Sequence, residues 1–562
     1  MDNDVNKKNA NVLLQGSILA AASLIVRIIG MVYRIPLTRI VGDTAMGYYT
    51  TAFEFYNIAL LLSSYSLPLA VSKLVSARQI TGRHVDSGRV LRVGLMFGII
   101  VGGAASLIVY FGADLYGRFN DTPDVAIPLR VLAPTIFVFA VMGVVRGFFQ
   151  GYGNMVPTAL SQIIEQIVNA IVSVAAAMIM MKKYQFFDNQ SAYGAAGGTW
   201  GTFLGACAGA LTLIVIFLIQ RRSYLKLVSD DRDREAERYG QILKILLITV
   251  IPVVFSQTVY QISGLVDVSV FNRVLSAKRY GEDLRTTWLG IYSNKYRLLT
   301  NVPVAIASAM GTAIVPSLVA EIASGRKHKV NEKIASAVKF NMIIAFPCAF
   351  GLMALGGPIL YMLYGDAREM TAQMMNIGGI AVVFFALSTV TNGVLQGINH
   401  MFLPVRHSLI ALFIHCGVLI ALLKYTDLDA IALVICNILF ALIVCILNAR
   451  SIRKLCGYKQ EWRTTFVLPL ISSAVMGAFA DICFRSLNKL LQTGIPTRPG
   501  ICNMIACLVT IGLCVFVYFA TLLLLGGVTV QEVREMPKGK KIASLFIKLH
   551  LLKDDTEVES KA

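Results

Sequence analysis

The sequence predicts an all-α integral membrane protein of about fourteen transmembrane helices, arranged as two six-helix lobes followed by two further helices. Three observations lead to this prediction: the composition, the spacing of apolar runs and an internal repeat. Hydrophobic residues make up 56% of the 562 residues and charged residues only 15%, and the mean hydropathy is +0.67. A soluble protein with several cores is far less apolar, so the chain is expected to lie in a bilayer.

Apolar runs long enough to cross a membrane, about 20 residues each, recur along the whole chain. In the first lobe they lie near 12–35, 47–72, 92–112, 125–148, 158–181 and 195–220. In the second lobe they lie near 243–270, 288–320, 334–358, 371–395, 403–424 and 428–448. Two last runs, near 465–484 and 501–526, complete the count, and the second and eighth runs are the least clean because they contain charges.

Polar connections between these runs divide the chain into six segments. They are an N-terminal lobe (1–220), a cytoplasmic linker (221–242), a C-terminal lobe (243–448), a second cytoplasmic linker (449–464), two helices (465–526) and a cytoplasmic tail (527–562). The tail contains KKIASLFIKLHLLK, which suits either an amphipathic helix on the anionic inner leaflet or a solvated tail. The first apolar run lacks a clear cleavage site and contains arginines, so we expect a retained helix rather than a secretory signal.

Lysine and arginine gather in alternate connections, at 73–92, 221–238, 326–329 and 450–463. The positive-inside rule places these connections, and hence both termini, in the cytoplasm. The connection at 271–287 is an exception, since it is basic but falls on the other side. This pattern explains the net charge of +19 without nucleic acid, because no basic domain or aromatic-interleaved basic patch is present. The ten cysteines include no CxxC pair and are expected to be buried thiols.

The two lobes carry the same short phrases in the same order. RGFFQGYGNMVP at 146–157 corresponds to NGVLQGINHMFLP at 392–404, and LYGRFND at 115–121 corresponds to LYGDARE at 363–369, with offsets of 246 to 248. Gly47 and Gly290, which open the second and eighth runs, are 243 apart. An even number of spans in each copy makes the repeat parallel, as in transporters whose site lies between two lobes near the membrane midplane.

Charged side chains inside the early apolar runs are candidates for function, because each costs at least about 2.5 kcal/mol to insert. Arg27 and Arg34 are seven residues apart and therefore share one helical face. Arg34, close to Pro36, either lines a cleft or reaches the membrane interface. Glu54 and Asn57 stand in the second run, and we expect them at the same cleft.

The eighth run repeats this pattern with the opposite sign. It contains Lys295 and Arg297, and Arg297 corresponds to Glu54 at the offset of 243. Lys295 either binds substrate or neutralises Glu54. Arg146 is expected to be a charge of a cytoplasmic turn, and Glu165 to hydrogen-bond to another helix.

The predicted cleft is mainly cationic, which favours an anionic cargo such as a phosphate or diphosphate, since arginine binds phosphate oxygens in pairs. Asp267 of the seventh run, near amides and a serine, suits a Na⁺ or H⁺ coupling site or else an ion pair with an arginine. No GxxxxGK[ST] motif is present, so ATP hydrolysis is not expected. We therefore expect a transporter, not an enzyme, without cofactor or resident metal and driven by an ion gradient, the membrane potential or substrate supply.

With these features, RxxGMVYRIPLTRIVG at 27–42 and RGFFQGYGNMVPTALSQIIEQ at 146–166 make the chain resemble the MOP superfamily of exporters. It is similar to the polysaccharide branch that includes the stage V sporulation protein B group and the MurJ-type lipid II flippases. The resemblance implies a bacterial cytoplasmic-membrane protein that flips an undecaprenyl-diphosphate-linked saccharide. It also implies cavity arginines, matched here by Arg27, by Tyr33 or Arg34 depending on a one-residue shift, and by Arg297. The last two spans are implied to form a lipid groove.

The sequence departs from that pattern in two places. Glu54 and Asn57 occupy the neighbourhood of the family's second-helix arginine, and the family's eleventh-helix sodium carboxylates have no counterpart. Two alternative functions stay open: a cation-coupled multidrug exporter of the same superfamily, and a membrane scaffold for cell-wall or sporulation enzymes.

Overall fold

The computed structural model describes residues 2–229, 231, 236–324, 326–494 and 498–528. Over these residues the secondary structure is entirely helical, without strands. The predicted amphipathic tail lies outside the described residues. The chain divides into two compact units, Met1–Asn294 with Leu423–Tyr425, and Lys295–Leu422 with Thr426–Ala562. The predicted division into segments stays a prediction.

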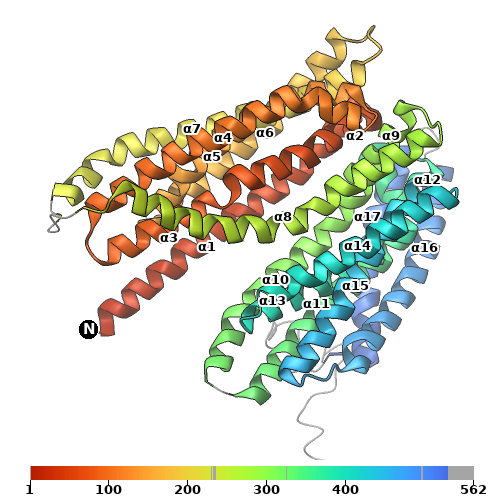
Figure 1. Cartoon of the computed structure of the whole chain (residues 1–562). Helices are drawn as coiled ribbons and strands as arrows, with labels where there is room; N and C mark the ends of the chain where they lie inside the picture. Colours follow the sequence, from red (N-terminus) through yellow and green to blue (C-terminus); the bar gives the residue numbers. More distant parts are fainter. Residues whose placement is uncertain (1, 230, 232–235, 325, 495–497, 529–562) are drawn as a thin grey trace, which may run out of the picture. The chain divides into compact units, whose positions relative to one another are not determined.

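The first unit consists mainly of long helices (Figure 1). They are α1 (Asp2–Val32), α2 (Arg34–Leu60), η1 (Leu61–Tyr65), α3 (Leu67–Ile80), α4 (His84–Phe119), η2 (Pro123–Val125), α5 (Ala126–Gly151), α6 (Val156–Lys183), α7 (Gln190–Ser229), α8 (Tyr239–Ala277) and α9 (Glu282–Ile291). The turn between the first two predicted spans is at Gly42, whose φ of 81° within α2 is open to glycine at no steric cost. The core of this unit is built on α2, α4 and α5, with Leu37, Tyr56 and Leu129 among its fully buried side chains.

The second unit continues with helices of similar length. They are α10 (Leu298–Ala323), α11 (Lys327–Tyr364), α12 (Glu369–Gly378), α13 (Ala381–Gly397), α14 (Phe402–Tyr425), α15 (Ala430–Cys456), η4 (Arg463–Val467), α16 (Leu468–Gly494) and α17 (Pro499–Leu524). The short π-helix η3 (Tyr292–Arg297) contains the division between the units. The last two helices, α16 and α17, pack on each other and on α11 (Figure 1), where Tyr518 donates to Ile343 O at 2.8 Å.

Eleven helical stretches in the described part of the chain are long and apolar enough to span a membrane. The number rises to twelve if α12 and α13, bent by 41°, form one span. The all-helical, multi-pass fold is therefore confirmed, whereas the predicted count of fourteen is not. The eleven do not include α8 and α10, which lie where the seventh and eighth spans are predicted, although α8 begins with the apolar stretch Tyr239–Ile251.

The two Gln-Gly turns have the same hydrogen bonds. In the first, Gly153 N donates to Gln150 O at 2.9 Å and Asn154 N to Phe149 O at 3.1 Å. The second turn repeats this 246 residues later, where Asn399 N donates to Gln396 O (3.0 Å) and His400 N to Leu395 O (2.9 Å). Gly153 and Asn399 both have positive φ, 76° and 63°, and asparagine tolerates that conformation better than other side chains.

The LYG phrases match in position but not in conformation. In the first unit α4 runs through Gly117 to Phe119, and Asp121 takes the positive φ of 52°. In the second unit α11 stops at Tyr364, and Gly365 itself caps the helix with a φ of 70°. The repeat is therefore closest where both the helix end and the next helix start are encoded locally.

Candidate functional site

Arg27 and Arg34 lie on one continuous stretch of helix in the first unit. Although α1 and α2 are separated at Tyr33, helical hydrogen bonds continue across it, with N–O distances of 3.1 and 3.2 Å. Two residues seven apart on such a helix share a face. Arg27 is exposed, and the half-buried Arg34 guanidinium lies 5.9 Å from the centre of the Tyr49 ring. This stretch therefore presents one open and one partly covered cation.

Two predicted carboxylates come to the same pair of helices, α2 and α8. A Cβ at Gly264 would lie 2.3 Å from Glu54 Oε2, so the glycine leaves room for the Glu54 carboxylate beside α8. Asp267 is buried and lies three residues further along α8, on the same helix face. Asn57, half-buried, follows Glu54 by three residues on α2. The arrangement offers carboxylate and amide oxygens, which are ligands of hard cations.

The sequence did not predict how closely α2 and α9 cross. A Cβ at Gly47 would lie 1.9 Å from Thr286 O, and a Cβ at Gly290 would lie 1.9 Å from Asp43 O. The backbones therefore touch, which only glycine allows at both points. Next to them, the Thr44 and Thr287 hydroxyls are hydrogen-bonded at 2.8 Å.

The residues at this crossing are related to one another by the internal repeat. Thr44 and Thr287, Gly47 and Gly290, and Asp43 and Thr286 are each 243 apart. Equivalent positions of the two copies thus meet each other, as in an interface around a two-fold axis. The sequence showed that Gly47 and Gly290 are equivalent positions of the repeat, but not that both lie at a helix crossing.

Further polar contacts hold α9 and the start of η3 in the first unit. Tyr48 donates to Glu282 Oε1 at 2.8 Å, and Asn294 donates to Thr50 Oγ1 at 2.9 Å. Burial raises the pKa of Glu282, and the Tyr48 hydrogen bond only partly offsets it. Arg285 is buried and donates to the carbonyls of Asn272 and Asp121 at 2.9 and 3.0 Å. Burial lowers the pKa of this guanidinium.

In the second unit, Lys295 pairs with a carboxylate that the sequence did not single out. Its Nζ lies 2.6 Å from Asp366 Oδ2, and both side chains are 4% exposed. Arg368 Nη2 also binds Asp366 Oδ2 at 2.6 Å, and the Thr371 hydroxyl donates to it at 3.0 Å. Burial alone would raise the pKa of Asp366, but the hydrogen bonds from Arg368 and Lys295 outweigh it and hold that pKa below its usual range. Lys295 is therefore part of a satisfied cluster.

Arg297 ends the π-helix η3 and is half-buried. Its neighbour Tyr296 is fully buried and donates to Asn437 Oδ1 at 3.3 Å, which fixes this turn against α15. The meeting of Arg27 with Arg297 in one cleft stays a prediction.

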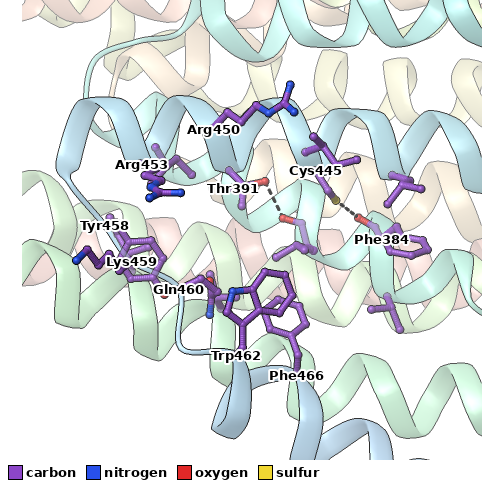
Figure 2. Close-up of a pocket in the computed structure, with 18 of the residues that line it drawn as sticks. Phe384, Thr391, Cys445, Arg450, Arg453, Tyr458, Lys459, Gln460, Trp462 and Phe466 are labelled. Carbon is purple, nitrogen blue, oxygen red and sulfur yellow. Dashed lines mark hydrogen bonds between the residues drawn. The ribbon is translucent and has the colours of Figure 1, made fainter.

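A pocket of about 660 Å³ lies within the second unit. Its walls come from α11, α13, α15, η4 and the start of α16 (Figure 2). Apolar side chains line most of it, among them Val383, Leu387, Ile446 and Phe466. Arg450, Arg453 and Lys459, which sequence analysis treats as basic charges of the second cytoplasmic linker, also line the pocket.

Comparison with known proteins gives the same fold and a family. Residues 12–320 match the family described as polysaccharide biosynthesis protein, and residues 296–420 match the MatE family. The lipid II flippase MurJ of Bacillus subtilis (strain 168) is 27% identical over 491 residues, which cover 84% of this chain and 88% of the relative. Stage V sporulation protein B of the same organism is 22% identical over 82% of this chain and 88% of its own length.

Among solved structures, the chain is similar to lipid II flippase MurJ in an inward closed conformation. The TM-score is 0.62 at 15% identity, covering 90% of this chain and 97% of the other. At this identity the likeness concerns the fold. The first family match, by contrast, covers residues 12–320 of the 562, more than half of the sequence. The chain therefore belongs to the polysaccharide biosynthesis protein family, within the MOP superfamily.

Proposed function

We propose that this multi-pass membrane transporter is an alternating-access flippase for an undecaprenyl-diphosphate-linked saccharide. Its expected cargo is the peptidoglycan precursor lipid II, moved from the inner to the outer leaflet of the bacterial cytoplasmic membrane. The observation that carries the proposal is the 27% identity to the B. subtilis lipid II flippase MurJ along 84% of this chain. The match of residues 12–320 to the polysaccharide biosynthesis protein family supports a saccharide as part of the cargo.

The charged side chains support an anionic headgroup. Arg27, Arg34 and Arg297 lie in or beside strongly apolar helices, where each guanidinium costs about 2.5–3.5 kcal/mol on insertion scales. A diphosphate offsets that cost because its oxygens accept paired hydrogen bonds from the planar guanidinium. Arg27 is exposed in the first unit, so its guanidinium is accessible to such a ligand.

Two further features suit a lipid-linked cargo driven across the membrane. The apolar helices α16 and α17 pack on α11 and lie beyond the two repeats, where a lipid tail would run. Glu54 and Asp267 place carboxylates on the α2–α8 pair, and we expect Na⁺ or H⁺ to bind there if an ion gradient drives transport. The membrane potential is the alternative source of drive.

The test is binding of undecaprenyl diphosphate to the purified full-length protein and to its Arg27→Ala and Arg297→Ala variants. Truncating one partner of a buried, hydrogen-bonded charge pair costs about 2 kcal/mol or more. Each variant should therefore bind about thirty-fold more weakly or worse. Arg118→Ala, which removes an exposed arginine at the end of α4, is the matched control and should bind normally.

The outcome separates the proposal from its alternatives. A membrane scaffold for cell-wall or sporulation enzymes need not bind the lipid at all, so absence of binding would favour it. The match of residues 296–420 to the MatE family favours a multidrug exporter as the second candidate. Export of a cationic dye by the reconstituted protein, unaffected by Arg27→Ala, would support that candidate and contradict a flippase.

A further inference from the structure

The pocket in the second unit combines an apolar interior with a basic mouth. Thr391 and Cys445 line the wall, but the hydroxyl and the thiol already donate to backbone carbonyls. Thr391 Oγ1 donates to Leu387 O at 2.8 Å, and Cys445 Sγ donates to Phe384 O at 3.1 Å (Figure 2). The interior therefore offers a ligand little beyond apolar contact. Such a surface gains free energy by covering a hydrocarbon chain rather than a sugar.

The mouth carries positive charge from three side chains, with Glu461 close to it in the chain. Arg450 and Arg453 project from the last turns of α15, and Lys459 follows in the connection to η4 (Figure 2). All three are exposed, and within the part of the chain that the structure describes none of them forms an ion pair. Trp462, 67% exposed, lines the same pocket, and tryptophan is typical of the membrane–water interface.

We propose that this pocket binds an anionic glycerophospholipid, with one acyl chain between α13, α15 and α16 and the headgroup phosphate held by Arg450, Arg453 and Lys459. Basic pockets between membrane helices on the cytoplasmic side bind anionic headgroups. The 450–463 connection is predicted to be cytoplasmic, so the lipid comes from the inner leaflet.

Size and location distinguish this lipid from a transported one. A volume of about 660 Å³ lies in the usual range of small-molecule sites, about 300–1,000 Å³, which suits one acyl chain. An undecaprenyl chain is several times longer. All lining residues also belong to the second unit alone, so the pocket need not open for cargo to pass. The inference does not rest on the proposed cargo, since a transporter of any substrate can hold a structural lipid.

The lipid should connect α15 to α16. These two helices are joined by the stretch 457–462, which has little helical structure of its own. A bound phosphate would join Arg450 and Arg453 on one side to Lys459 on the other. A ligand that binds only the folded state stabilises it, so the thermal midpoint should rise with lipid concentration.

The experiment counts lipids bound to the purified full-length protein by native mass spectrometry, while thermal unfolding is followed during a titration. Phosphatidylglycerol is compared with phosphatidylcholine of the same acyl chains. The test variant is Arg450→Gln with Arg453→Gln. The control is Lys454→Gln with Arg463→Gln, which removes two exposed cations of the same region that do not line the pocket.

We expect the wild type and the control pair to retain one phosphatidylglycerol and to be stabilised by it. The R450Q/R453Q variant should bind it about thirty-fold more weakly, since each basic residue near the surface contributes about a factor of five. Ala449→Trp, which fills the exposed part of the lining, should abolish acyl-chain binding while leaving all three cations in place. High salt should weaken binding to the wild type.

Three results would overturn the proposal. In the first, phosphatidylcholine is retained as firmly as phosphatidylglycerol, and in the second, the control pair loses as much binding as the test pair. In the third, undecaprenyl phosphate displaces phosphatidylglycerol and itself depends on Arg450 and Arg453, which would make the pocket a polyprenyl site. Loss of cargo binding in the Arg27→Ala variant with normal phosphatidylglycerol binding would show that the two sites are independent.

Discussion

At the residue scale, charges buried in the apolar helices are held by specific partners. Arg146 was expected to be a turn charge, but it is buried in α5, where it donates to Ser161 Oγ at 3.0 Å and pairs with Glu165 at 2.7 Å. His407 is also buried, and its ring nitrogens lie 2.7 Å from Asn448 Oδ1 and 3.2 Å from Ser451 Oγ. Helix packing thus uses several of the ionisable groups that sequence alone marks as unusual.

The Asp366 cluster makes a prediction about stability. Asp366→Asn leaves Lys295 buried without its countercharge, and breaking a buried ion pair from one side costs about 3 kcal/mol or more. Asp114→Asn is the control, because its partner Arg130 and Asp114 itself are 40% and 55% exposed, and such a pair contributes about 0–1 kcal/mol. Thermal unfolding of both purified variants measures the difference. Equal midpoints would contradict the role of the buried cluster.

The same cluster predicts a dependence on pH. Because the pKa of Asp366 is held below its usual range, the stability it supplies is complete above about pH 4, the ordinary aspartate value. That stability is lost as the pH falls through the lowered pKa of the folded state. The difference in unfolding midpoint between wild type and Asp366→Asn should therefore be constant at neutral pH and shrink in acid. A difference that grows as the pH falls would contradict the assignment.

At the element scale, the crossing of α2 and α9 brings two helix backbones into contact. Two glycines bring the backbones together, and the Thr44–Thr287 hydrogen bond crosses the same point. Gly47→Ala should destabilise the protein by about 1–3 kcal/mol, as overpacking does. Gly112→Ala in α4, whose Cβ would meet nothing within 4 Å, should instead be neutral or stabilise by about 0.5–1 kcal/mol. Unfolding midpoints distinguish the two, and equal effects would mean that the crossing is loose.

The crossing also predicts a reversible block of transport. Cysteines replacing Thr44 and Thr287 would stand where two hydroxyls are now 2.8 Å apart, close enough for a disulfide. The first native cysteine is Cys207, so a bond between positions 44 and 287 is easily mapped. If α2 and α9 separate during the cycle, the oxidised double variant should not transport and a reductant should restore it. Either single variant serves as control, and full transport by the oxidised protein would mean that α2 and α9 stay together.

How much the sequence revealed differs between elements. The Gln-Gly turns and the helices around them were predictable, because glycine, asparagine and proline act within a few residues of themselves. The partner of Lys295 was not, since Asp366 is 71 residues away and helical periodicity indicates a face but not a neighbour. The basic mouth of the pocket was not predictable either. Arg450 and Arg453 fit the positive-inside pattern, which accounts for their charge but does not indicate that they line a cavity.

At the scale of the whole molecule, the two repeats give the chain its membrane fold, and the family places it among transporters. Composition and span counting were sufficient for the all-helical class, whereas the predicted number of fourteen spans stays unconfirmed. The predicted cationic cleft depends on Arg27 and Arg297, which belong to different units. The prediction that both arginines bind the cargo is therefore tested by measuring transport.

The most direct measurement is flipping of an undecaprenyl-diphosphate-linked saccharide in proteoliposomes that contain only the purified protein. The fraction of lipid II exposed on the opposite leaflet is followed with time for wild type, Arg27→Ala, Arg297→Ala and the Arg118→Ala control. We expect the wild type and the control to equilibrate lipid II between leaflets, and both cleft variants to remain at the rate of protein-free vesicles. Flipping at the wild-type rate by both cleft variants, or no flipping by the wild type under any ion gradient or potential, would contradict a flippase that holds its cargo by the diphosphate.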